Sequence, residues 1–175
     1  FPFQVGEYGT GANFALRRIA AYQLGGFDEA LGVGTPTGGG EDLDMFVRVL
    51  LAGWALVVEP SALVWHRHRD DSEALVQQAR GYGRGLGAWL TKVVTTPSTA
   101  ALAAQRAVVG LRRLAAVRRG SVSSRRVDLA HGLPPAYVAE LGRLEVQAVF
   151  QGPRAYWRSR LAGNRKRPLA SRASR

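Results

Sequence analysis

The stretch Gly-Gly-Gly-Glu-Asp-Leu-Asp-Met-Phe-Val-Arg, residues 38–48, determines the local structure around it. From Leu43 on, apolar residues recur at three- and four-residue spacing and Gly53 supplies a stop, so the pattern predicts a helix from Glu41 to about residue 51. Glu41 and Asp42 fall in the first turn, where the dipole and the free N–H groups stabilise a carboxylate. Residues 32–40, with five glycines, predict a loop that does not pack and becomes ordered only with a ligand.

Shorter elements are predicted on both sides of this helix. A glycine-rich turn feeds a short strand within residues 8–16, and residues 17–24 form a short helix that Gly25-Gly26 stops. Residues 54–58 and 62–65 are rich in β-formers and predict two strands separated by Pro60. Four helices are expected after them, at residues 72–82, 88–94, 98–119 and 135–149. The glycines of residues 81–87 separate the first of these helices from the second.

The composition is that of a globular protein and excludes several classes of site. The 175 residues are 46% hydrophobic, and the longest apolar runs are too short to span a bilayer. The chain has no Cys, which excludes a disulfide framework, a thiolate zinc site and a cysteine nucleophile. The first residue is Phe1 and no signal sequence follows it, so we expect a fragment or a processed chain with a cytoplasmic location.

The positive charge is concentrated in the C-terminal part of the chain. Residues 1–100 hold 8 Lys and Arg against 10 Asp and Glu, whereas residues 101–175 hold 16 against 3. This region predicts a solvated basic surface first, then an anionic lipid surface at the inner face of the plasma membrane. Since no nucleic-acid-binding motif accompanies the charge, we expect no specific nucleic-acid partner. Residues 164–175 are basic and serine-rich and predict a disordered tail.

Two groups of side chains are candidates for chemistry. An ionised carboxylate at a loop edge, such as Asp42, can act as a general base, although acids also stabilise helix N-termini for purely structural reasons. Asp42 and Asp44 form an Asp-x-Asp pattern, but within a helix their side chains point about 200° apart, which argues against a shared metal site. His66 and His68 face the same way on an extended backbone and could share a metal, or they could simply end a strand.

Six pieces of sequence in a fixed order give a more specific signal. They are Gly-Thr-Gly-Ala-Asn-Phe-Ala-Leu-Arg-Arg (9–18), Gly-Gly-Phe-Asp-Glu (25–29), Gly-Glu-Asp-Leu-Asp-Met-Phe-Val-Arg (40–48), Ala-Gly-Trp (52–54), Glu-Pro (59–60) and Val-Trp-His-Arg-His (64–68). Together they resemble the acceptor-side half of family 2 glycosyltransferases. The resemblance covers about residues 5–95 and is weak or absent beyond them.

The resemblance implies an α/β GT-A fold and inverting transfer of a sugar from a nucleotide-sugar donor to the hydroxyl of a glycan or lipid-linked acceptor, such as an envelope glycan. It assigns the general base to Asp42 with Glu41 beside it, and a place in the shell of a divalent metal, Mg or Mn, to His66. Gly11 and Asn13 would line the acceptor side of the pocket. Gly39 and Gly40 belong to the glycine loop, residues 38–40, that would close over both substrates.

The resemblance also sets the expected domain organisation. Residues 1–95 would be the acceptor-side half of a GT-A domain, residues 96–163 a basic helical region, and residues 164–175 the tail. Because a donor-binding half is missing, we expect no turnover from this chain alone. Processive relatives carry Gln-x-x-Arg-Trp after the base, whereas here Gln77 and Arg80 are followed by Gly81, which favours transfer of a single sugar.

Two other functions are compatible with the sequence. The chain could be a catalytically inactive module that binds a glycan or a partner subunit. It could instead be a basic protein that binds lipid or nucleic acid, in which case the motifs are incidental.

Overall fold

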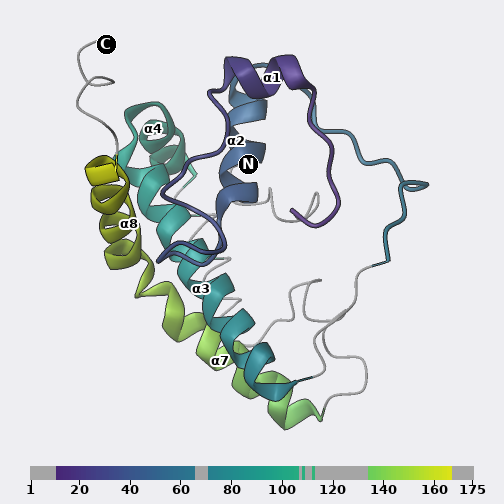
Figure 1. Ribbon diagram of the computed structural model, residues 1–175, viewed down its shortest axis with the longest axis vertical. Coiled ribbons are helices and arrows are strands. Elements are labelled where there is room, and N and C mark those ends of the chain that lie inside the picture. Colours follow the sequence, from purple (N-terminus) through teal and green to yellow (C-terminus); the bar gives the residue numbers. More distant parts are fainter. Residues whose placement is uncertain (1–10, 66–70, 107, 109–111, 113–133, 167–175) are drawn as a thin grey trace.

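The computed structural model describes residues 11–65, 71–106, 108, 112 and 134–166, which contain helices and no strand (Figure 1). The long helix α3 is central, with α7 and α8 packed along it and α2 and α4 in contact with it. The helices are α1 (Arg18–Gln23), α2 (Glu41–Leu51), α3 (Ser72–Thr95), α4 (Pro97–Gln105), α7 (Pro135–Val149) and α8 (Gly152–Lys166).

The α/β GT-A fold expected from the sequence is therefore wrong for the described residues, which are all-helical. Strands were expected within residues 8–16 and at residues 54–58 and 62–65. The described residues of these segments form no strand. Residues 54–65 instead run from the end of α2 away from the helices (Figure 1). A β-rich composition produces a strand only where another strand satisfies its backbone N–H and C=O groups, and no described segment does so here.

Several predicted helices are confirmed. Helices α1, α2 and α7 match the expected segments, and Gly25, Gly26 and Gly53 adopt the positive φ values typical of residues just beyond a helix end. The helix expected over residues 98–119 is shorter: α4 ends at Gln105, and much of the remaining segment lies outside the described residues. Helix α8 lies mostly within the region of residues 96–163 that was expected to be helical, although no separate helix was predicted there. Its last turn includes the first three residues of the expected tail.

Helix α3 is continuous where the sequence predicted an interruption, because its four glycines lie at two close contacts, one with α7 and one with the loop of residues 38–40. A Cβ built on Gly83 would overlap the Glu145 carbonyl of α7, and one built on Gly87 would overlap the Val149 carbonyl. Gly81 and Gly85, on another side of the helix, face residues 38–40. Close backbone approach offsets the cost of about 1 kcal/mol that each glycine imposes on a helix interior.

The close contact predicts opposite effects for two glycine-to-alanine substitutions. Gly87→Ala is expected to lower the free energy of unfolding by about 1–3 kcal/mol, since the added methyl group forces α3 and α7 apart. Gly163→Ala, in α8 with open space around it, should raise that energy by about 0.5–1 kcal/mol through helix propensity. Urea unfolding followed by circular dichroism measures both. Equal stabilisation by the two changes would contradict the close packing of α3.

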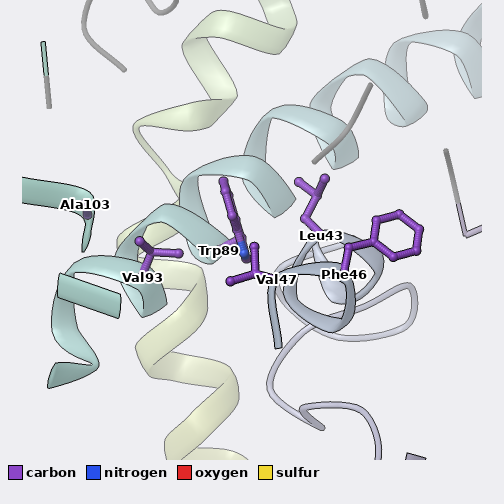
Figure 2. Close-up of a cluster of buried hydrophobic side chains, with 6 residues drawn as sticks. All are labelled: Leu43, Phe46, Val47, Trp89, Val93 and Ala103. Atoms are coloured by element: carbon purple, nitrogen blue, oxygen red, sulfur yellow. The ribbon is translucent and has the colours of Figure 1, made fainter. Parts of the chain in front are cut away.

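The hydrophobic core joins α2, α3 and α4. Figure 2 shows Val47 of α2 beside Trp89 and Val93 of α3. The cluster consists of Leu43, Phe46, Val47, Trp89, Val93 and Ala103, all at most 8% exposed. On the other side of α2, the ring of Phe14 packs edge-on against Phe46 at 5.3 Å. The apolar periodicity of α2 is thus explained by burial on more than one side.

Among the described helices, none combines the length and the apolar run needed to cross a membrane.

Candidate functional site

The loop of residues 32–40 leads directly into α2 and is held by its own hydrogen bonds. The backbone N–H of Gly32 donates to the Thr37 hydroxyl (3.1 Å) and to the Gly39 carbonyl (3.2 Å). The hydroxyls of Thr35 and Thr37 lie 2.8 Å apart, and Thr37 is fully buried. The expectation that this loop does not pack is therefore wrong, because the threonine hydroxyls supply side-chain hydrogen bonds that glycine cannot make.

Packing against α3 fixes where the loop ends and α2 begins. Gly40 is the N-cap of α2 and adopts φ +93°, in the left-handed region that favours glycine. A Cβ on Gly40 would lie 2.6 Å from the Gly85 carbonyl oxygen of α3, and one on Gly39 would lie 3.6 Å from the Gly81 carbonyl oxygen. Gly39 and Gly40 thus set the position from which Glu41 and Asp42 project.

Asp42 contacts the glycine-rich segment that precedes α1. Its Oδ2 accepts a hydrogen bond from the backbone N–H of Gly11 (3.0 Å), and its Oδ1 accepts one from Leu43 N–H (2.8 Å). Asp42 is half-buried, and each carboxylate oxygen has two lone-pair sites. The two backbone bonds orient the carboxylate.

The other predicted site residues are distributed differently. The Glu41 side chain packs against Gly32, and its Oε2 is buried with no hydrogen-bond partner among the described residues. Asn13 does not join Asp42: its side-chain amide donates to the Ala62 carbonyl (2.8 Å) and so ties the segment before α1 to residues 54–65. His66 lies outside the described residues, as do His68 and His131.

A cavity of about 860 Å³ lies on the side of α2 that faces these two segments. Asn13 and Ala62 contribute to its wall, and Met45, Phe46 and Val49 of α2 contribute to its lining. Most of the remaining lining residues are apolar, and Asp42 is not among them. The cavity is therefore distinct from the carboxylates at the start of α2.

Asp44, the second acid of the Asp-x-Asp pattern, has a structural role. It is 4% exposed and pairs with Arg48 (2.7 Å) and with Lys92 of α3 (2.7 Å). The Arg48 guanidinium also donates to the carbonyls of Leu24 and Gly26 at 2.8 Å each, beyond the end of α1. This network joins α1, α2 and α3, and its Asp44–Lys92 pair spans 48 residues, which sequence spacing could not reveal.

Asp28 completes the network through a 2.7 Å ion pair with Lys92. Burial raises the pKa of Asp28, but the hydrogen bond and charge of Lys92, the Ala30 amide and Arg160 outweigh it, so the pKa lies below its ordinary value of 3.8. A carboxyl group whose pKa is lower in the folded state stabilises the fold above its unfolded pKa. That contribution is lost as the pH falls below 3.8 and through the lowered value.

Arg84 of α3 lies beside the glycine loop, and the sequence analysis did not single out this cation. It is half-buried, and a Cβ on Gly38 would lie 3.5 Å from its Nη2. Its Nε is buried without a hydrogen-bond partner, and no described carboxylate forms an ion pair with it. The sequence feature that could have indicated Arg84 is its position one helical turn after Arg80, on the same face of α3.

Among residues 11–65, 71–106 and 134–166, no three or more His, Asp or Glu side chains are grouped so that they could hold a metal ion. A comparison of the chain with protein-family models, curated proteins and solved structures found no match.

Proposed function

We propose that this chain acts in the transfer of a sugar from a nucleotide-sugar donor to a hydroxyl group of a glycan or lipid-linked acceptor. The observation that carries the proposal is the 3.0 Å hydrogen bond between Gly11 N–H and Asp42 Oδ2. It joins two of the six sequence pieces across 31 residues, at the carboxylate that the chemistry requires.

Asp42 serves as the general base. A lone pair of its carboxylate takes the proton of the acceptor hydroxyl while the oxygen attacks the anomeric carbon of the donor. The new C–O bond forms as the bond to the diphosphate breaks on the opposite face, so the anomeric configuration inverts. The bonds from Gly11 and Leu43 hold the carboxylate in one orientation, which favours proton transfer at a fixed distance.

Arg84 is the described cation best placed to receive an anionic group at the glycine loop. Its half-buried guanidinium has donors free for a phosphate, and arginine binds phosphate through paired hydrogen bonds. Together, Asp42 and Arg84 place a base and a positive charge at the two ends of the segment of residues 38–42. Transfer from a nucleotide sugar needs both, one for the acceptor and one for the departing diphosphate.

This assignment predicts that Arg84→Gln raises KM for the nucleotide sugar by about tenfold to a hundredfold, because a hydrogen bond to a charged group contributes about 1.5–3 kcal/mol. Arg143→Gln, which removes an exposed charge from α7, should leave KM unchanged. Steady-state kinetics with varied donor concentration measures both. An unchanged donor KM in Arg84→Gln would remove Arg84 from the site.

A divalent metal is implied only by the resemblance to family 2 glycosyltransferases. Mg or Mn would assist departure of the diphosphate, with His66 as one ligand. The steps assigned to Asp42 and Arg84 do not depend on a metal held by described residues.

The decisive experiment is a transfer assay on the protein at the full length that its gene encodes. A panel of nucleotide sugars and glycan or lipid-linked acceptors is followed by release of nucleoside diphosphate and by NMR of the product. We expect release that depends on the acceptor and a product with inverted anomeric configuration. Binding of a glycan without any release would identify a binding module instead and would overturn the proposal.

A further inference from the structure

Helix α8 buries one side against the rest of the protein. Gly152, Ala155, Tyr156 and Ser159 are buried, and Gly152 meets Gly87 of α3 so closely that a Cβ would overlap it. In Figure 1, α8 lies along α3 on the outer edge of the molecule. One side of this helix is therefore fully occupied by intramolecular packing.

The opposite side of α8 exposes large apolar side chains. At about 100° per residue, Trp157 and Leu161 project away from the buried side. Trp157 is 47% exposed and Leu161 is 61% exposed, and Phe150, just before the helix, is 74% exposed. Single exposed apolar residues are ordinary, but Trp157 and Leu161 are neighbours four residues apart on one helix face.

Arginine side chains flank this apolar stripe on both sides. The same helical geometry places Arg160 at one edge of Trp157 and Leu161, and Arg154 and Arg158 at the other. All three are exposed, and no Asp or Glu occurs from Gly152 to Lys166. Arg160 donates to the Tyr156 hydroxyl (2.8 Å), whereas Arg154 and Arg158 form no ion pair with a described residue.

We propose that the outer face of α8, formed by Arg154, Trp157, Arg158 and Leu161, binds the surface of an anionic membrane. Trp and Leu enter the boundary between headgroups and acyl chains, while arginines reach the lipid phosphates with their aliphatic parts along the apolar layer. A nucleic acid would pair its phosphates with the arginines but would leave the apolar side chains of Trp157 and Leu161 without a partner. This inference is independent of sugar transfer, and it concerns attachment to a membrane surface.

The test is co-sedimentation of the full chain with vesicles of phosphatidylcholine alone and with vesicles of equal parts phosphatidylcholine and phosphatidylglycerol. We expect binding to the anionic vesicles only, weakened by added salt. The double variant Arg154→Gln/Arg158→Gln should bind them about 30-fold more weakly, since each basic residue near such a surface contributes about 1 kcal/mol and 1.4 kcal/mol is tenfold. Trp157→Ala should also weaken binding, and circular dichroism verifies that each variant is folded.

The matched control is Arg17→Gln/Arg18→Gln, which removes the same charge from exposed positions at the start of α1. It should retain nearly the full affinity. Equal losses in the two double variants would show that net charge alone attracts the protein and would overturn the assignment to α8. Equal binding to neutral vesicles, no binding to anionic vesicles, or binding unaffected by Trp157→Ala but competed by duplex DNA would each overturn it as well.

Discussion

Asp42→Asn is expected to lower the transfer rate by about 10²–10⁴-fold, the usual contribution of a general base. The amide has nearly the shape of the carboxylate but lacks the basic oxygen that takes the acceptor proton. Its remaining carbonyl oxygen can still accept one of the two backbone bonds, from Gly11 or from Leu43. The variant should therefore stay folded and bind the nucleotide sugar with nearly the affinity of the unmodified protein.

The measurement compares kcat with donor affinity in the protein at the length that its gene encodes. Glu140→Gln is the matched control, because it makes the same chemical change at an exposed position of α7. Loss of kcat with retained donor affinity would support Asp42 as the base. If Asp42→Asn transferred sugar as fast as the control, Asp42 would return to the structural role of an acid at a helix N-terminus.

Asp44→Asn is expected to lower the free energy of unfolding by about 3 kcal/mol, the lower end of the cost of breaking a buried ion pair. Asp44 is 4% exposed and neutralises both Arg48 and Lys92. Without its charge these two cations remain close together with only Asp28 to balance them. Lys92 keeps Asp28, and Arg48 keeps its two backbone carbonyls, which places the loss at the lower end.

Urea unfolding followed by circular dichroism tests this expectation, provided that the m value stays constant. Glu140→Gln again serves as the control and should change stability by less than about 0.5 kcal/mol, as exposed substitutions usually do. A loss of that small size in Asp44→Asn would show that the network joining α1, α2 and α3 contributes little to stability.

The candidate site was predictable as far as local sequence determines it. The acids at the start of α2, the apolar face of that helix and its glycine stop follow from short-range spacing, and the structure confirms them. The hydrogen bond between Gly11 and Asp42 was not predicted, since the resemblance assigned Gly11 only to the acceptor side of the pocket and Asp42 to the role of the base. Arg84 and Lys92 could not be placed, because their roles depend on which face of α3 meets the glycine loop and α2.

The sequence by itself determined helices α1, α2 and α7, since apolar periodicity, the acids at the start of α2 and the glycines that follow α1 and α2 act within a few residues. Only the tertiary structure decided the rest. Residues 54–65 have the composition of strands but no strand partner among the described residues, and α3 keeps its four glycines because α7 and the loop of residues 38–40 approach it closely. The physical reason is that strand pairing and close helix packing depend on groups far away in the chain, which no local pattern specifies.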